Sequence, residues 1–258
     1  MRLIRTGIIL FLFSLLLSGC GFYSGVEKDK VMVKKIETSA SSPPVQYEGT
    51  LSEGAYETLG LNAINSFYGH NLTSEDILME GSGLDLQQIK AIIASTQASS
   101  DPGNSFLVQY KDQLSRVEQG VYLANIVNKY EREDAYGVVF NAKNGEVLGL
   151  YRLRSSSTTL DKTKTVLGME ELKEKAGQSL PSVSDAAAGE LELVDESIVS
   201  DDRITEFDYR SKESGSVVLS LLLDRSTGEL DGYYKDIMSV IQYLIARTKY
   251  ATSVIEAR

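Results

Sequence analysis

The chain has 258 residues, of which 26 are Lys or Arg and 36 are Asp or Glu, so its net charge is −10. This excess of negative charge disfavours nucleic acid and other polyanions as partners, because like charges repel. The hydrophobic content of 42%, with 14 Tyr and 7 Phe, suffices for a globular core. A single cysteine excludes any disulfide within the chain.

A signal-peptide pattern occupies residues 1–19. Arg2 and Arg5 precede an apolar run, residues 8–17, which only Ser14 interrupts. A membrane-spanning helix needs about 20 apolar residues, and this run has half that length. We therefore expect residues 1–19 to direct export and then to be removed.

The segment Leu17-Ser18-Gly19-Cys20 resembles the bacterial lipobox. The resemblance implies cleavage before Cys20 and attachment of diacylglycerol, with palmitate-type chains, to its thiol. Because two acyl chains anchor a protein durably, Cys20 is the expected lipidation site, and the protein is expected at the extracytoplasmic face of the cell membrane. The alternative is an ordinary secreted protein with a cysteine near its cleavage site. It is disfavoured because Cys20 is the only cysteine.

Residues 20–54 lack sustained periodicity and contain a Ser- and Pro-rich run at 39–44, which is typical of a flexible tether. Within them, residues 31–36 are a candidate short strand. The next element is a helix over residues 55–68, where apolar residues recur at helical spacing. Gly69 is expected to end this helix.

The rest of the chain repeats itself at a constant offset of 83 positions. Residues 84–90 match residues 167–173, and residues 136–151 match residues 219–234 without a gap. We infer a tandem duplication in which each unit has a helix, several strands and a closing strand pair. The units are residues 55–154, with an extra N-terminal helix, and residues 167–258, with a C-terminal helix. A Ser-, Thr- and Lys-rich linker, residues 155–166, joins them.

Each closing strand pair has a glycine where a tight turn needs a positive φ. Asn144-Gly145 and Thr227-Gly228 occupy these turns. The strands predicted around them are residues 137–141, 146–152, 217–224 and 229–235, preceded by 121–130 and 204–210 and further by 106–110 and 190–194. A closing amphipathic helix is predicted over residues 236–250. It is expected to pack on the core, because its polar face offers a membrane only Arg247 and Lys249 as cations.

These turn sequences resemble those of the PepSY domain. The resemblance is carried by Phe140, Asn141 and residues 144–147 in the first unit, and by Leu223, Asp224 and residues 227–230 in the second. It spans residues 84–152 and 167–235. It implies an α+β fold of two tandem helix-plus-antiparallel-sheet units. PepSY-like domains occur as inhibitory pro-segments of secreted peptidases and as modules on lipoproteins, so the resemblance implies binding or regulation outside the cell without catalysis.

The sequence offers little for catalysis. His70, the only histidine, is expected to cap the last carbonyls of its helix, and no Gly-x-Ser-x-Gly frame accompanies it. With one histidine and Cys20 lipidated, a zinc site is implausible. The acidic pairs also lack the spacing of a calcium loop. We therefore predict no catalytic residue, no metal and no cofactor, and we expect Gly81-Ser82-Gly83 to be a plain turn.

Tyrosines recur in the predicted strands, where they could line a sugar- or peptide-binding face. Because strands favour tyrosine in any case, packing is the preferred interpretation. The residues concerned are Tyr122, Tyr130, Tyr136, Tyr151, Tyr209, Tyr233 and Tyr234.

The leading hypothesis is therefore a non-enzymatic, membrane-anchored binding or regulatory lipoprotein that acts on a protein partner at the cell envelope. The alternative is an envelope hydrolase or transferase that uses carboxylates. Such chemistry needs two carboxyl groups within about 10 Å. The candidates are Glu133, Asp134, Asp201 and Asp202. A third possibility, a binding protein feeding a transporter, is disfavoured because the chain is short for two closing lobes.

Overall fold

The computed structural model describes residues 51–98, 110–131, 134–153, 165–184, 186 and 188–245. They belong to one compact unit, residues 45–258. The signal peptide, Cys20, the candidate strand 31–36, the strand residues 106–109 and linker residues 155–164 lie outside the described residues. Within the described ranges, no helix is both long and apolar enough to cross a membrane.

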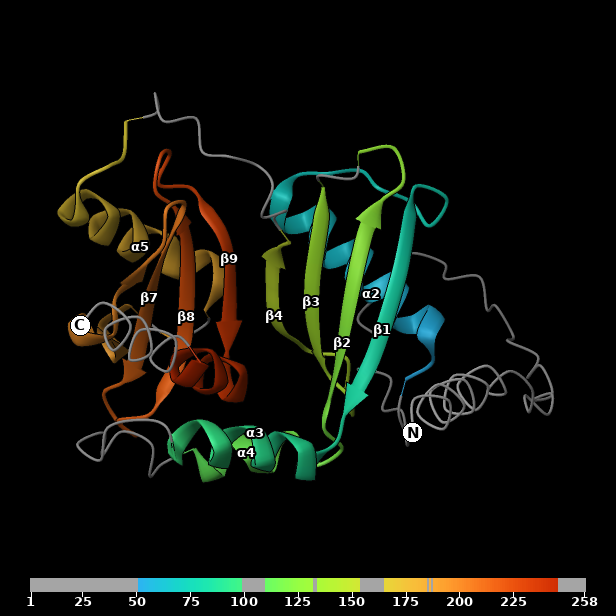
Figure 1. Cartoon of the computed structure of the whole chain (residues 1–258), viewed down its shortest axis with the longest axis horizontal. Helices are drawn as coiled ribbons and strands as arrows, with labels where there is room; N and C mark the ends of the chain where they lie inside the picture. Colours follow the sequence, from blue (N-terminus) through green and yellow to red (C-terminus); the bar gives the residue numbers. More distant parts are fainter. Residues whose placement is uncertain are drawn as a thin grey trace, which may run out of the picture. The chain divides into compact units, whose positions relative to one another are not determined.

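The described residues form an α+β fold with nine strands in one antiparallel sheet (Figure 1). The order is β1-β2-β3-β4-β9-β8-β7-β5, and β6 pairs with β7. The strands are β1 (Ile77–Leu84), β2 (Val121–Asn128), β3 (Ala135–Asn141), β4 (Val147–Arg152), β5 (Leu191–Leu193), β6 (Val199–Ser200), β7 (Ile204–Ser211), β8 (Val217–Asp224) and β9 (Leu230–Lys235). The helices are α2 (Glu53–Tyr68), α3 (Leu86–Ala98), α4 (Lys111–Arg116), α5 (Met169–Val183) and residues 236–245.

The predicted hairpins are confirmed, and their turns share one backbone pattern. In the β3–β4 turn the N–H of Gly145 donates to the carbonyl of Asn141, and Gly145 has φ 73°. Gly228 donates to Asp224 in the same way in the β8–β9 turn, with φ 70°. A third copy joins β7 to β8, where Gly215 donates to Ser211 with φ 70°. A polar residue with a glycine four positions later thus forms all three turns, because only glycine adopts positive φ without strain.

The two halves of the sheet meet at its centre in an approximately twofold arrangement. Strands β2, β3 and β4 correspond to β7, β8 and β9 at the offset of 83. At the junction β4 pairs with β9, with Leu150 opposite Tyr233 and Gly149 opposite Tyr234. Equivalent strand positions from both halves lie in one hydrophobic cluster: Ala124 with Phe207, Ile126 with Tyr209, Tyr136 with Leu219, Val138 with Leu221 and Phe140 with Leu223.

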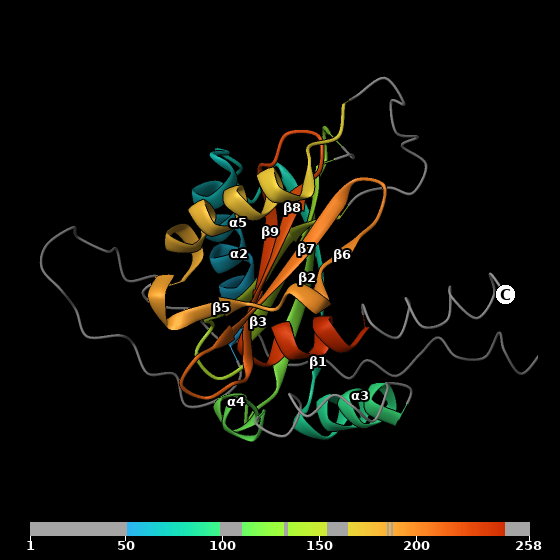
Figure 2. The same cartoon turned by 90° about the vertical axis from the view of Figure 1, so that its left-hand side faces the viewer.

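One face of this sheet is covered by α2 and α5 (Figure 2). Helix α2 contacts β2, β3 and β4, as α5 contacts β7, β8 and β9. Their buried positions coincide at an offset of 116, with Tyr56 corresponding to Leu172 and Ile64 to Leu180. Helix α2 is therefore the counterpart of α5 and not an extra element.

The opposite face carries α3, α4 and residues 236–245. Ile89 and Ile93 of α3 belong to the cluster on this face, whereas Leu172 of α5 belongs to the cluster on the other. The sequence match between residues 84–90 and 167–173 thus pairs two helices that pack on different faces. The predicted packing of the last helix on the core is confirmed for its described part, in which Ile237, Val240, Ile241 and Leu244 are buried.

The predicted boundaries between the units cut through this continuous sheet. Residues from both sides of the predicted linker share the β4–β9 pairing and one hydrophobic cluster. The two halves therefore fold as parts of a single body.

Candidate functional site: an open sheet edge and two hollows

The two edges of the sheet are unlike each other. One edge is formed by β5 and β6, which have three and two residues and are flanked by short 3-10 helices. The other edge is β1, which has eight residues and pairs with β2 along its whole length. Among the described residues, no strand pairs with the outer side of β1. Proteins usually shorten or cover such an edge, because its free N–H and C=O groups template pairing with another chain.

The ladder geometry identifies which backbone groups of β1 face outward. Lys129, which follows β2, donates its N–H to the carbonyl of Asp76, so these two residues form a hydrogen-bonded pair. Hydrogen-bonded and non-bonded pairs alternate along an antiparallel ladder. The residues of β1 whose N–H and C=O groups point away from β2 are therefore Ile77, Met79, Gly81 and Gly83.

A hollow of about 570 Å³ adjoins this edge. It is lined by Leu51, Glu53, Tyr56, Gly81, Gly83, Leu84, Asp85, Gln88, Gln119, Val121, Tyr122 and Ala142. The ring of Tyr122 stacks on that of Tyr56, with centroids 3.9 Å apart. Burial raises the pKa of Tyr122, and the nearby Glu53 carboxylate adds to the effect. Aromatic walls of this kind suit a side chain from an added strand.

The two glycines of β1 shape this hollow. A Cβ on Gly81 would collide with the ring of Tyr122, which lies across it. A Cβ on Gly83 would find only the carbonyl of Val121, 4.0 Å away. The expectation that Gly81-Ser82-Gly83 forms a plain turn is thus wrong, since these residues are part of β1. The residues on both sides of this segment pair with β2, and this pairing holds the two glycines in the strand despite the preference of glycine for turns.

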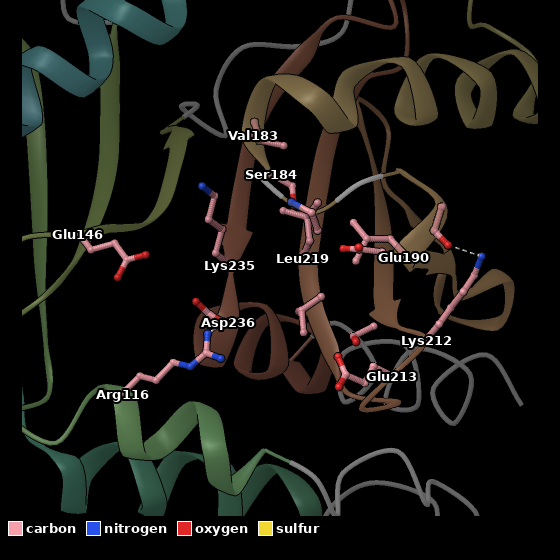
Figure 3. Close-up of a pocket in the computed structure, with 15 residues that line it drawn as sticks. Arg116, Glu146, Val183, Ser184, Glu190, Lys212, Glu213, Leu219, Lys235 and Asp236 are labelled. Atoms are coloured by element: carbon pink, nitrogen blue, oxygen red, sulfur yellow. Dashed lines mark hydrogen bonds and ion pairs between the residues drawn. The ribbon is translucent and has the colours of Figure 1, made fainter.

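A second hollow, of about 600 Å³, is lined mainly by the other half of the sheet, with Arg116 and Glu146 contributed by the first half (Figure 3). Its apolar lining includes Val183, Leu191 and Leu219, and a charged rim of both signs surrounds them. On this rim Arg116 forms an ion pair with Asp236, N to O 3.1 Å. Burial raises the pKa of Asp236, although Arg116 opposes the shift. Asp236 also has φ 48°, which is rare outside glycine.

The sequence suggested that His70 caps the last carbonyls of α2, but the structure shows a different role for it. Gly69 ends that helix with φ 72°, and the Nε2 of His70 lies 2.7 Å from the hydroxyl of Tyr136. The rings of Tyr68 and Tyr136 are 5.0 Å apart, and the guanidinium of Arg152 lies 4.7 Å above the ring of Tyr68. His70 is therefore part of an aromatic group packed between α2 and the sheet.

Most of the strand tyrosines pack in the core and do not line an exposed binding face. Tyr136, Tyr209, Tyr233 and Tyr234 are buried, and Tyr130 lies beyond β2 with 78% of its surface exposed. Only Tyr122 borders the hollow beside β1. The packing interpretation is thus confirmed for the four buried residues.

Of the carboxylates considered for catalysis, the described ones, Asp134, Asp201 and Asp202, line neither hollow. Asp201 and Asp202 are exposed, and the Asp201 carboxylate accepts the N–H groups of Arg203 and Ile204 in a turn. Asp134 precedes β3, and Glu133 lies outside the described residues. Within the part of the chain that is described, no group of three or more His, Cys, Asp or Glu residues could hold a metal ion.

No protein-family model and no curated protein matches the chain. Among solved structures, the Bacillus megaterium YpeB C-terminal domain is similar, with a TM-score of 0.40 and 14% sequence identity. The alignment covers 74% of this chain and 65% of that one, so the chain spans less than two thirds of that domain's length. A likeness at this level does not transfer a function, so the geometry of the site has to carry the assignment.

Proposed function

We propose that the protein is a lipid-anchored, extracytoplasmic binding or regulatory module that acts on a protein partner at the cell envelope without catalysis. In this proposal Cys20 carries the lipid, residues 20–54 form the tether, and each half of the sheet is a PepSY-like unit. The observation that carries the binding function is the difference between the sheet edges. An extended segment of the partner adds to β1 as a tenth strand.

Strand addition explains why β1 is long and regular. Backbone hydrogen bonds from an added strand supply affinity, and pockets for alternate side chains supply specificity. The outward groups of Ile77, Met79, Gly81 and Gly83 offer the hydrogen bonds. The hollow beside Gly81 and Gly83 offers room for one side chain of the added strand.

Charge favours a partner that is not itself acidic. Loss of Arg2 and Arg5 with the signal peptide would leave 24 basic and 36 acidic residues, a net charge of −12. The charged residues that line the hollow beside β1 are Glu53 and Asp85. A partner segment bearing Lys or Arg would therefore associate faster, because complementary potentials steer encounter.

Photo-crosslinking in intact cells tests the proposal. A photoreactive amino acid at Ser82, an exposed position of β1, should capture a protein partner, and one at Asp202, beside the short edge, should not. Mass spectrometry of the adduct would identify the partner segment. Capture from Asp202 alone, or from neither position under several growth conditions, would refute binding at β1.

Two substitutions at Gly83 separate backbone pairing from simple crowding. Gly83→Pro removes an outward N–H without breaking the β1–β2 ladder, because the N–H of Gly83 faces away from β2. Gly83→Ala keeps that N–H and adds a methyl group whose nearest neighbour is the carbonyl oxygen of Val121, 4.0 Å away. We expect the proline variant to reduce crosslinking at least about tenfold and the alanine variant to retain it. Equal crosslinking by both variants would contradict strand addition.

A further inference from the structure

Four residues that line the hollow in Figure 3 correspond to Phe67, Tyr68, Tyr136 and Arg152 of the first half. At the strand offset of 83, Leu219 corresponds to Tyr136 and Lys235 to Arg152. At the helix offset of 116, the end of α5 corresponds to the end of α2. Val183 then corresponds to Phe67, and Ser184 corresponds to Tyr68.

In the first half this position is closely packed. Phe67 and Tyr68 are in edge-to-face contact with centroids 4.8 Å apart, and Tyr68 lies 5.0 Å from Tyr136. The Arg152 guanidinium covers Tyr68, and the Tyr68 hydroxyl donates to the carbonyl of Asp231 at 2.7 Å. The space between the end of α2 and the sheet is therefore filled by aromatic rings, and the guanidinium of Arg152 lies over one of them.

In the second half the same position is held by smaller side chains. Val183, Ser184 and Leu219 replace Phe67, Tyr68 and Tyr136, and a hollow of about 600 Å³ remains. The cation is kept, because Lys235 stands where Arg152 does, with its Nζ 5.2 Å from the centre of the Tyr233 ring. The second half thus retains the surroundings of the aromatic group without its rings.

We propose that this hollow binds an aromatic side chain, of the tyrosine type, from a protein partner. The ring lies on Val183, Leu191 and Leu219, and its face or edge meets the Lys235 ammonium as Tyr68 meets Arg152. The rim of both signs, with Lys212 and Glu190 among its members, suits the polar backbone of a peptide better than a uniformly charged ligand. This site does not involve β1 and stands whether or not strand addition occurs.

The probe is N-acetyl-tyrosinamide, titrated into the soluble mature domain and followed by NMR of the methyl groups of Val183 and Leu219. We expect saturable shifts of these signals in the millimolar range, and binding of N-acetyl-serinamide at least about tenfold weaker. Free tyrosine should bind no better than the blocked probe. Tighter binding of free tyrosine would assign the hollow to a metabolite and overturn the proposal, as would equal binding of the two blocked amides.

Two variants test whether the probe binds in the hollow. Ser184→Tyr restores the residue found at the equivalent position of α2 and should fill the space, weakening probe binding at least about tenfold. Lys235→Gln shortens the side chain by one atom and removes the charge, which should weaken binding about threefold. Ser82→Ala on β1 serves as the matched control and should bind normally. If the Ser184→Tyr variant does not fold, the Lys235→Gln result decides, and unchanged binding by that variant overturns the proposal.

Discussion

Leu150 of β4 and Tyr233 of β9 lie opposite each other at the centre of the sheet, and they also occupy the same position in the two halves, 83 residues apart. Each of these two residues is the counterpart of the other in the opposite half. An approximate twofold axis through the sheet therefore passes between them. The neighbouring pairs agree, since Gly149 faces Tyr234 and Tyr151 faces Gly232. On one face of the sheet α2 contacts β2, β3 and β4 as α5 contacts β7, β8 and β9, and both helices share one hydrophobic cluster.

The first prediction concerns the two glycines at this junction, which are equivalent to each other. A Cβ on Gly232 would lie 2.6 Å from the carbonyl oxygen of Leu150 and 2.7 Å from the Cα of Tyr151. Both are backbone atoms, so the strands must separate. We expect Gly232→Ala to lower the free energy of unfolding by about 3 kcal/mol, at the upper end for overpacking, measured by urea denaturation.

Gly149→Ala, at the equivalent position of β4, should cost less free energy of unfolding than Gly232→Ala. Its Cβ would lie 2.9 Å from the Cδ1 of Tyr234 and 3.3 Å from the Cγ2 of Val139, which are side-chain atoms. Side chains yield more easily than backbone, so its cost should be nearer about 1 kcal/mol. Both variants should still unfold in one transition. Two separate transitions in the unaltered protein would contradict a single folded body.

The second prediction has the opposite sign and concerns Gly177 in the middle of α5. A Cβ there would have no neighbour within 4 Å. Alanine forms helix more readily than glycine by about 1 kcal/mol. Gly177→Ala should therefore raise the free energy of unfolding by roughly that amount in the same urea assay. A destabilised variant would show that α5 packs more tightly at this position than the structure indicates.

The hairpins could be predicted from sequence because their causes are local. A glycine with positive φ four residues after a polar residue fixes each turn, whatever the rest of the fold does. The third copy, Ser211 to Gly215, carries the same signal with serine in place of asparagine or aspartate. A polar residue followed four positions later by glycine, with serine counted as polar, therefore predicts this turn as well.

The helices could not be assigned in the same way. The buried stripe of a helix shows that it has an apolar face but not which side of a sheet that face meets. Residues 84–90 resemble residues 167–173 in sequence, yet Ile89 and Leu172 pack on opposite faces. The true counterpart of α5 is α2, displaced by an offset of 116, because α3 and α4 are inserted between α2 and β2.

Neither hollow could be predicted, for a related reason. Residues on α2, β1 and β2 line the one beside β1, and their adjacency depends on long-range pairing. The hollow of Figure 3 exists because the side chains of Ser184 and Leu219 are small. That signal becomes visible only when each is compared with its counterpart, Tyr68 or Tyr136.

The third prediction concerns alkaline pH. Burial raises the pKa of Tyr136, Tyr209 and Tyr233 to about 12 each, from the usual 10.0. In the unfolded chain these phenols ionise first, so unfolding is favoured as pH rises. The contribution of these phenols to the free energy of unfolding should be unchanged below about pH 10, and the free energy of unfolding should fall between about pH 10 and 12. Urea denaturation across that range, with phenolate absorbance, measures it.

Two variants assign that loss to buried phenols. Tyr209→Phe should make the decline shallower, because burial is what shifts the pKa of this residue. Tyr130→Phe, at the exposed position, should leave the decline unchanged. A decline that begins well below about pH 10, or that both variants alter equally, would point to other groups.

The last prediction concerns the anchor at Cys20. A single acyl chain binds membranes only marginally, whereas two hold a protein there, so the location of this protein should depend on one thiol. Cys20→Ser removes the acceptor for diacylglycerol, and the protein should then be released or remain unprocessed with its signal peptide. Membrane fractionation with metabolic labelling by a palmitate analogue measures both outcomes. Ser18→Ala keeps a small residue before the cleavage site and should still be lipidated. A Cys20→Ser protein that still incorporates the label would refute the assignment of Cys20 as the lipidation site.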